Sequence, residues 1–330
     1  MSFKDIAGNK RVKGILSKAL QRQRVPNSLL FTGPKGVGKK EIALTLAKAL
    51  NCTKKNDDSC ETCAPCLSIK KGNFPDVLVI EPVGSYIKID QIRQVKHLAH
   101  LKPMVGRKRV FVVNKAEKMN EEAANSFLKI LEEPPYFSHI ILITTNPYLI
   151  LPTIKSRCQT LSFSAISKVE IERILVEKGY KKEQAQLMSL LVRGNLERAL
   201  SLEWEDIQGK RKEAWEQFSS LVQKKEVSRF VSDFTSLRNR IQRDELEEIL
   251  EFYSSFCRDF ILVKEKGNLI YLLNPDLGEN IQKIEKVFSL KQLMFLLKNI
   301  DFAIYALHKN VNITMLVSSF YSDIMEGEYV

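Results

Sequence analysis

The segment from Gly33 to Lys40 has the residue types and the spacing needed to bind phosphate. It reads Gly-Pro-Lys-Gly-Val-Gly-Lys-Lys and fits the pattern GxxxxGK[ST] up to its last position, where Lys40 replaces the hydroxyl residue. Glycines let the backbone turn tightly and aim its N–H groups at phosphate oxygens, and Lys39 adds a charge near the β- and γ-phosphates. The alternative is a glycine turn before an ordinary helix. The predicted phosphate loop consists of Gly33, Pro34, Lys35, Gly36, Val37, Gly38, Lys39 and Lys40.

The groups that would handle a metal ion and a water molecule are missing. In a hydrolysing protein with such a loop, a later strand ends in Asp-Glu, where Asp holds Mg²⁺ and Glu orients the attacking water. Here the apolar run 110–113 ends in Asn114 and Lys115, and Lys40 lacks the hydroxyl that ligates Mg²⁺. We therefore expect no intrinsic catalysis. Binding of ATP or ADP without hydrolysis stays open, and a slow ATPase that recruits its metal differently is the alternative.

Four cysteines lie within fifteen residues, in the spacing C-x7-C-x2-C-x2-C. Two successive CxxC steps place thiolates close enough to share one tetrahedral metal ion, and four thiolates leave no open position for catalysis. The spacing therefore predicts a structural Zn²⁺ site, with a redox pair as the alternative. The predicted ligands are Cys52, Cys60, Cys63 and Cys66, whereas Cys158 and Cys257 lie far away and are expected to be buried and unpaired.

Composition sets the class of protein and the compartment. The chain has 330 residues, 44% of them hydrophobic and 27% charged, which is typical of a globular protein with two or three domains. Neither a membrane span nor the apolar core of a signal peptide is visible, so we expect a cytoplasmic protein. The net charge of +12 favours phosphate-bearing partners. A free-standing, zinc-dependent nucleic-acid-binding protein is one reading of these features.

The elements that must position these residues alternate between strand and helix over the first 165 residues. Continuous apolar strands separated by helices predict a parallel sheet buried on both faces. The prolines at 134 and 135 end one of the helices. The expected strands are 28–32, 76–81, 109–113 and 139–144, and the expected helices are 39–50, 90–100 and 121–131.

Beyond residue 165 the pattern becomes helical. Short helices are expected at 167–179, 182–192 and 196–202, and longer ones at 244–263 and 290–307. Turns are expected at Gly267-Asn268 and Asn274-Pro275. This pattern predicts an α/β domain at 1–165, a small helical domain at 166–207 and a helical C-terminal domain at 208–330.

Five segments together resemble the clamp-loader subunits of the AAA+ class, the proteins that load the sliding clamp in bacterial DNA replication. Leu30 to Lys39 is similar to the phosphate loop of this family, and the four cysteines occupy the place of its zinc module. The segment from Ala123 to Pro135 is similar to a highly specific family sequence. Ser156-Arg157-Cys158 and Gly194 to Leu200 match the Ser-Arg-Cys motif and the sensor segment.

The resemblance implies a function that composition and spacing do not give. Lys40, Asn114 and Lys115 stand where motor subunits of the family carry catalytic groups, so the chain is similar to the non-hydrolysing member. The family implies an AAA+ α/β domain, a helical lid and a helical collar. Its partners are the motor (gamma/tau) subunits and the delta subunit in a five-subunit ring, which acts on the sliding clamp and primed DNA. Polymerase activity belongs to the DNA polymerase III holoenzyme.

Two arginines receive roles from the same resemblance. Arg157 is implied to be an arginine finger that reaches into the ATP site of a neighbouring motor subunit, and a surface salt bridge is its alternative. Arg198 is implied to be a sensor at the nucleotide site of its own chain. Thr145 and Asn146 end a strand, where either a polar sensor or a simple turn fits.

Overall fold

The structure is a computed structural model that describes residues 1–55, 57–222, 243–265, 269–284, 286, 289–308 and 311–326. The chain divides into two compact units. One consists of residues 1–179 with 192–200, and the other of residues 180–191 with 201–330. Each unit contains a hydrophobic core of its own. The three-domain partition, with boundaries at 165 and 207, stays a prediction.

The first unit is built on a five-stranded sheet in the order β2-β3-β4-β1-β5, and every adjacent pair is parallel. All residues of β1, β3 and β4 are buried, which is why the central residues of these strands are apolar. The predicted parallel α/β sheet is therefore confirmed. The strands are β1 (Ser28–Thr32), β2 (Val77–Ile80), β3 (Arg109–Val113), β4 (Ser138–Thr144) and β5 (Gln159–Ser162).

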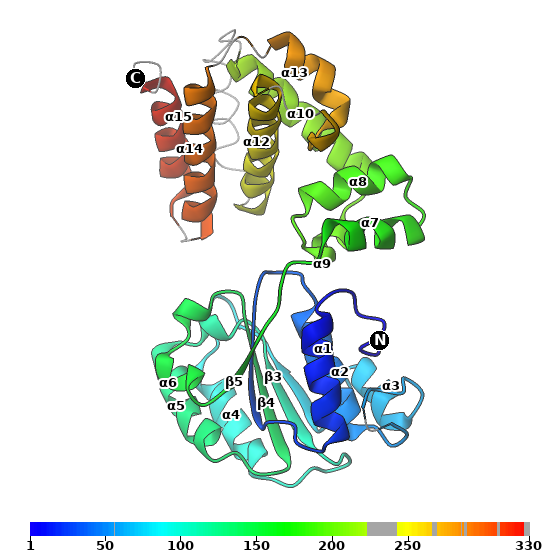
Figure 1. The fold of residues 1–330 in the computed structure, drawn as a ribbon. Helices are drawn as coiled ribbons and strands as arrows, with labels where there is room; N and C mark the ends of the chain where they lie inside the picture. The colour runs from blue at the N-terminus through cyan, green and yellow to red at the C-terminus, as the bar shows by residue number, and fades with distance from the viewer. Residues whose placement is uncertain are drawn as a thin grey trace. The chain divides into compact units, whose positions relative to one another are not determined.

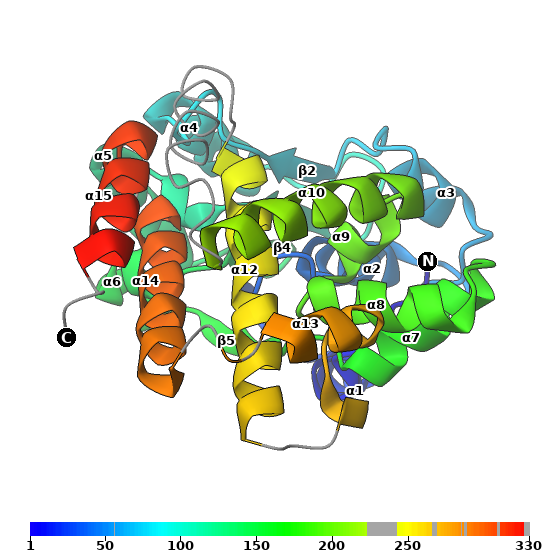
Figure 2. The ribbon, with the colours of Figure 1, turned by 90° about the horizontal axis from the view of Figure 1, so that it is seen from above.

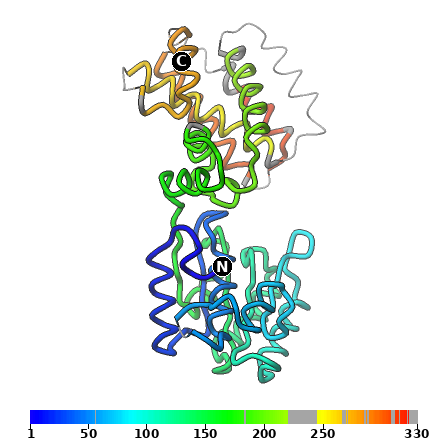
Figure 3. The backbone as a smooth tube through the Cα atoms, turned by 90° about the vertical axis from the view of Figure 1, so that its right-hand side faces the viewer, coloured from blue at the N-terminus to red at the C-terminus, as the bar shows by residue number. Residues whose placement is uncertain are grey.

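Helices cover both faces of this sheet, α1 and α2 on one side and α4 and α5 on the other (Figure 1). The trace in Figure 3 shows α1 in dark blue along the flank of the unit. The helices are α1 (Lys10–Gln21), α2 (Lys39–Asn51), α3 (Ala64–Lys70), α4 (Ile89–Ala99), α5 (Glu121–Glu132), α6 (Pro152–Lys155), α7 (Lys168–Glu177) and α9 (Leu196–Ser201), with 3₁₀ turns η1 (Ala116–Lys118) and η2 (Pro147–Leu149).

A buried ion pair fixes the edge of the sheet opposite to the phosphate loop. Asp76, with no exposed surface, accepts hydrogen bonds from the backbone N–H groups of Met104, Val105 and Gly106, each at 2.8 Å. The guanidinium of Arg109 donates to the same carboxylate at 2.8 Å. Although burial raises the pKa of Asp76, these donors hold it below its ordinary value. One carboxylate therefore anchors the loop that leads into β3.

The second unit is helical in the residues described. Helix α12 packs against α10, α13 and α14, and α14 packs against α15; Figure 2 shows α12, α14 and α15 side by side. Its core contains Phe218, Phe256 and Phe260, and Cys257 is fully buried. The helices are α8 (Lys182–Leu191), α10 (Trp204–Val222), α12 (Arg243–Lys264), α13 (Gly278–Ile284), α14 (Leu290–His308) and α15 (Ile313–Glu326), with 3₁₀ turns at Leu269–Tyr271 and Pro275–Leu277.

The predicted turn at Asn274-Pro275 is present, because Asn274 precedes the second of these 3₁₀ turns. The predicted turn at Gly267-Asn268 lies outside the described residues. No helix in the described part of the chain combines the length and the apolar character that crossing a membrane requires.

Candidate nucleotide site and metal centre

The predicted phosphate loop joins the carboxyl end of β1 to the start of α2. Gly33, Gly36 and Gly38 have φ values of 143°, 69° and 86°, which glycine adopts without strain. A Cβ on Gly33 would lie 2.4 Å from the carbonyl oxygen of Phe163, and one on Gly36 would lie 1.6 Å from the Oδ1 of Asn195. Glycine is thus required both by backbone conformation and by close packing of neighbouring segments.

Lys39 is the most buried charge of the loop, with 6% of its surface exposed. Its Nζ donates to the carbonyl oxygens of Gly33, at 2.7 Å, and of Pro34. Burial lowers the pKa of Lys39 to about 8, while Glu117, Glu41 and Glu197 oppose that shift. The ammonium is therefore held inside the loop, close to its own deprotonation at neutral pH.

A cavity of about 350 Å³ lies over the loop at the carboxyl ends of the strands, where open α/β sheets bind their ligands. Five of the predicted loop residues line it, whereas Val37 is buried in the core and Gly33 and Pro34 contribute carbonyls to Lys39. The lining residues with charge are Lys35, Lys39, Lys40, Lys115, Glu41, Glu81, Glu117 and Glu197. The cavity is therefore rich in charges of both signs.

Lys40 makes an ion pair at the position where a phosphate loop would supply a metal ligand. Its Nζ lies 2.7 Å from Oε1 of Glu81, and Asn114 donates to both oxygens of the same carboxylate, at 3.2 and 3.0 Å. Mg²⁺ needs oxygen ligands in octahedral geometry. Here the loop offers an ammonium and the strand end an amide, so the residues present do not fit the Mg²⁺ that the fold implies.

Glu117 and Thr145 meet on the far wall of the cavity. The hydroxyl of Thr145 donates to Oε1 of Glu117 at 3.0 Å. Oε2 of Glu117 is buried and has no hydrogen-bond partner among the described residues. Asn146 instead caps the following 3₁₀ turn by accepting from the N–H of Tyr148. Thr145 thus contacts the site, and Asn146 forms the exit turn of the strand.

The segment that precedes α9 closes the loop from above. The side chain of Asn195 packs on Gly36 and accepts a hydrogen bond from the N–H of Arg198 at 2.9 Å, while the N–H of Glu197 donates to the Gly36 carbonyl at 3.2 Å. Glu197 lines the cavity. The predicted sensor segment therefore reaches the site through Asn195 and Glu197, and the role of Arg198 as a sensor stays a prediction.

The four predicted metal ligands come together. The sulfur atoms of Cys52, Cys60, Cys63 and Cys66 all lie within 4.8 Å of one another, and Cys60 and Cys66 are 4.0 Å apart. In a tetrahedral site with Zn–S bonds of about 2.3 Å, sulfur atoms lie roughly 3.8 Å apart. Backbone N–H groups of Lys55 and Cys63 point at the sulfurs of Cys52 and Cys60, both at 3.3 Å. This group can hold a metal ion such as zinc.

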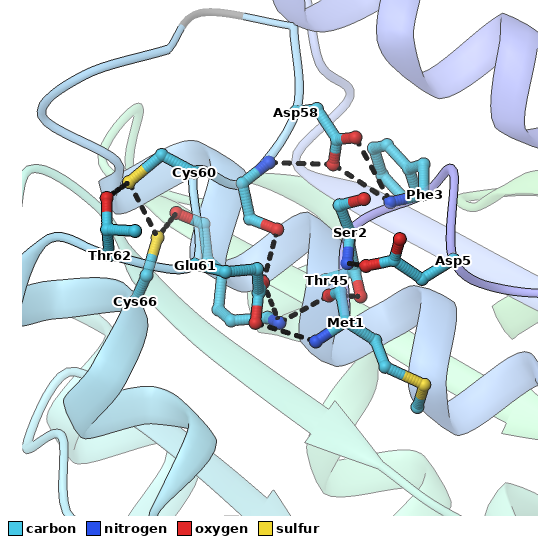
Figure 4. A network of polar contacts seen from close by, with 12 residues as sticks. Met1, Ser2, Phe3, Asp5, Thr45, Asp58, Cys60, Glu61, Thr62 and Cys66 are labelled. Carbon is cyan, nitrogen blue, oxygen red and sulfur yellow. Dashed lines mark hydrogen bonds and ion pairs between the residues drawn. The ribbon is translucent and has the colours of Figure 1, made fainter.

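Figure 4 shows how the cysteine loop is tied to the start of the chain. The buried Lys48 of α2 donates to the carbonyl oxygen of Met1 at 2.5 Å and forms an ion pair with Glu61. The N–H of Phe3 donates to Asp58 at 2.9 Å. Burial raises the pKa of Glu61, but Lys48, the Met1 amine and Ser59 together lower it to about 2. The cysteine loop thereby fixes the N-terminal residues against α2.

Arg157 follows α6 and is one-third exposed. Its Nε donates to Glu132 at 2.8 Å, a second nitrogen contacts the same carboxylate, and the third donates to the carbonyl of Thr153 at 2.9 Å. Glu132 ends α5, in the segment 123–135 that the sequence singled out. The guanidinium is thus oriented within its own chain, and its role in trans stays a prediction.

Known proteins are similar to this chain in sequence, and one of them is similar along nearly its whole length. The sequence profile of the family described as "DNA polymerase III, delta subunit" matches residues 8–167. The DNA polymerase III subunit delta' of Bacillus subtilis is 29% identical over 318 residues, which cover 96% of each chain. The chain is therefore similar to a delta' subunit along nearly its whole length, and to this family over its first half. The predicted α/β fold with a helical C-terminal part is confirmed by the parallel sheet and by the helices of the second unit.

Other DNA polymerase III proteins are also similar to this chain. Bacillus subtilis subunit tau is 32% identical over 211 residues, which cover 61% of this chain and 37% of tau. A solved structure of a gamma-subunit-related protein from Thermotoga maritima covers 96% of this chain and 98% of that chain, at 19% identity and a TM-score of 0.49.

Sequence reasoning found the loop and the cysteines but missed three acidic residues of the site. Glu81, Glu117 and Glu197 all line the cavity. Glu81 has a readable signal, because it is the last residue of the predicted strand 76–81 and so lies at the carboxyl edge of the sheet. Glu117 and Glu197 carry no comparable signal, since their position depends on η1 and on the return of the chain to the loop near residue 195.

Proposed function

We propose that this chain is a delta'-like, non-hydrolysing subunit of a bacterial clamp loader. It would assemble with motor and delta subunits and help to place a sliding clamp on primed DNA. The observation that carries the proposal is the ion pair of Lys40 with Glu81, which also accepts from Asn114. A cation and an amide stand where hydrolysis needs a hydroxyl and a carboxylate. Full-length similarity to a delta' subunit supports the same role.

The contribution of this subunit to catalysis would come from Arg157, acting on the ATP site of a neighbouring motor subunit. A guanidinium stabilises charge on a transferring phosphoryl group, and such a finger is worth about 10³–10⁵ in rate. Glu132 and the Thr153 carbonyl orient Arg157 but leave it one-third exposed. The partner's phosphate would compete with Glu132 for a side chain that is already turned toward the surface.

The decisive experiment uses the assembled complex. Arg157→Ala should leave the chain folded and able to join the ring, while ATP turnover at the neighbouring site falls by about 10³ or more and clamp loading slows. Arg157→Lys should restore little, because a point charge cannot reproduce the planar fork. Arg173→Ala is the matched control, since Arg173 is exposed in an ordinary i,i+4 pair with Glu177.

Assembly must be checked by size-exclusion chromatography so that a missing subunit is not mistaken for a missing finger. Unchanged ATPase and loading rates in a fully assembled Arg157→Ala complex would exclude the role in trans. Arg157 would then be a surface salt-bridge residue that connects α5 to α6.

The cysteine cluster and the cavity receive complementary roles in this proposal. Cys52, Cys60, Cys63 and Cys66 would hold a structural Zn²⁺ that supplies cross-linking and no chemistry, since all four positions of the ion are filled. The phosphate loop would bind ATP or ADP without turnover, through Gly33 to Lys40.

A further inference from the structure

The cavity over the phosphate loop keeps every feature needed for phosphate except the metal site. The glycine backbone, the buried Lys39 and the start of α2 are in place. Lys35, Lys40 and Lys115 add three further cations to the lining. A nucleotide in a hydrolysing site brings Mg²⁺ to neutralise its phosphates, so a site that rejects Mg²⁺ must neutralise them otherwise.

The Lys40 ammonium is such a cation, and Glu81 holds it beside Asn114. The Lys40–Glu81 separation is 2.7 Å, and the two Asn114 contacts orient the carboxylate. Both members of the pair are 42% exposed, so water screens the pair and it contributes little to stability. Its importance is positional: a divalent cation entering here would meet the ammonium of Lys40 and would find no carboxylate on Asn114.

We propose that this cavity binds the phosphates of a nucleotide without Mg²⁺. The Lys40 ammonium takes the place of the metal ion that neutralises the phosphates in a hydrolysing site. The inference rests on the nucleotide binding assigned under the proposed function and deepens it by naming the cation that neutralises the phosphates. The role of Arg157 is independent of it, because a chain that binds no nucleotide could still supply Arg157 to a neighbour. It also assigns Glu81 a role, as the positioning residue that holds Lys40 over the loop.

The acidic residues indicate which nucleotide fits. Glu117 lies close enough to Lys39 to counter the lowering of its pKa, and one of its oxygens is buried without a hydrogen-bond partner in the described chain. Glu197 approaches from α9. A third phosphate adds negative charge beside these carboxylates. The site should therefore bind a nucleoside diphosphate at least as tightly as the triphosphate.

The test measures binding of fluorescent ADP and ATP to the full chain, in EDTA and in Mg²⁺. Saturable binding in EDTA is expected, with an affinity that Mg²⁺ changes by about three-fold or less. The double variant Lys40→Thr with Asn114→Asp restores the hydroxyl and the carboxylate, so Mg²⁺ should raise its affinity by about ten-fold or more. Lys39→Ala should abolish phosphate-dependent binding in both backgrounds.

Two further variants distinguish the effect of the position of Lys40 on ADP binding from the effect of the net charge of the chain. Glu81→Gln keeps the size of the side chain but releases Lys40, and it should weaken ADP binding in EDTA. Lys18→Thr removes one positive charge from the exposed face of α1 and should leave binding unchanged.

Absence of saturable binding in EDTA, or a larger increase with Mg²⁺ in the unaltered chain, would overturn the inference. ATP binding tighter than ADP binding would overturn the diphosphate preference. Absence of binding would also remove the nucleotide binding assigned under the proposed function. It would leave the role in the ring, which the Arg157 variants and the assembly check test separately. Conversely, the Arg157→Ala complex could keep full ATPase activity while the chain binds ADP without Mg²⁺. That result would exclude the role of Arg157 in trans and would support the nucleotide site.

Discussion

At the scale of single residues, two adjacent lysines have different physical tasks. Lys39 points into the loop, is almost fully buried, and bonds to two carbonyl oxygens of the loop itself. Lys40 points outward to Glu81 and remains partly exposed. Burial lowers the pKa of Lys39, because its ammonium leaves water. The pH dependence of the site should therefore follow Lys39.

We expect the affinity for ADP to fall as the pH rises through 8. The free chain has a Lys39 pKa of about 8, because burial disfavours its charged form. Bound phosphates favour the ammonium, so above pH 8 binding must also take up a proton. Between pH 7 and pH 9 the affinity should drop by about ten-fold. Titration calorimetry at both pH values measures this, and Lys39→Arg should flatten the profile. A flat profile in the unaltered chain would contradict the assignment.

At the scale of elements, short loops are fixed by a few polar or metal-binding groups instead of a large core. The cysteine loop between α2 and α3 depends on four sulfurs and on Lys48, Asp58 and Glu61. The loop before β3 depends on Asp76, which accepts three backbone N–H groups. Removing one group should therefore loosen a whole segment.

Replacing any of Cys52, Cys60, Cys63 or Cys66 by Ser should reduce zinc content below one ion per chain and make the loop more sensitive to proteases. Thiolate ligands exchange metal for protons, so zinc should be released on acidification. Cys158→Ala is the control, because Cys158 is buried in the core around α5 and β4. Elemental analysis gives the metal content. Native protein without zinc would contradict the assignment.

Asp76→Asn should lower the free energy of unfolding by about 3–5 kcal/mol, since it leaves the buried guanidinium of Arg109 without its counter-charge. The pKa of Asp76 is lowered in the folded chain, so its contribution is present above its ordinary pKa and is lost as the pH falls below 3.8. Urea unfolding measures both effects. Asp90→Asn, at an 81% exposed carboxylate, should cost less than about 0.5 kcal/mol; equal losses would refute the argument.

At the scale of the whole molecule, the chain divides into an α/β unit and a helical unit. The first unit carries the phosphate loop, the cysteines and Arg157, and the second is helical wherever it is described. Under the proposed function, catalysis needs a neighbouring subunit. The nucleotide site of this chain lacks groups that handle a metal ion and water, and Arg157 acts at the site of the neighbour. The isolated chain should therefore be inactive.

The purified chain should show no ATP turnover above that of a Lys39→Ala variant. Lys39→Ala removes the buried charge of the loop, so any true turnover at this site must disappear with it. A phosphate-release assay with Mg²⁺ present provides the measurement. Turnover that is lost specifically in the variant would instead support the alternative of an active P-loop ATPase.

Several elements were missed by sequence reasoning, for different reasons. Helix α1 has a readable signal, because Val12, Leu16 and Leu20 are spaced four residues apart and are buried. Strand β5 has one buried residue and lies at the edge of the sheet, so no apolar run marks it. Its existence depends on pairing with β1, which lies more than a hundred residues away.

The sequence by itself determined the parallel sheet, the phosphate loop, the four cysteines and the loss of the catalytic groups, because these depend on local pattern and spacing. Only the tertiary structure decided which acids surround the loop. Glu81, Glu117 and Glu197 lie far apart in the chain and meet at the cavity for different reasons. Glu81 follows β2, Glu117 lies in η1 after β3, and the segment near residue 195 returns to the phosphate loop. The same is true of the Lys40–Glu81 and Arg157–Glu132 pairs. Tertiary packing brings these partners together, and no spacing in the sequence indicates the pairing.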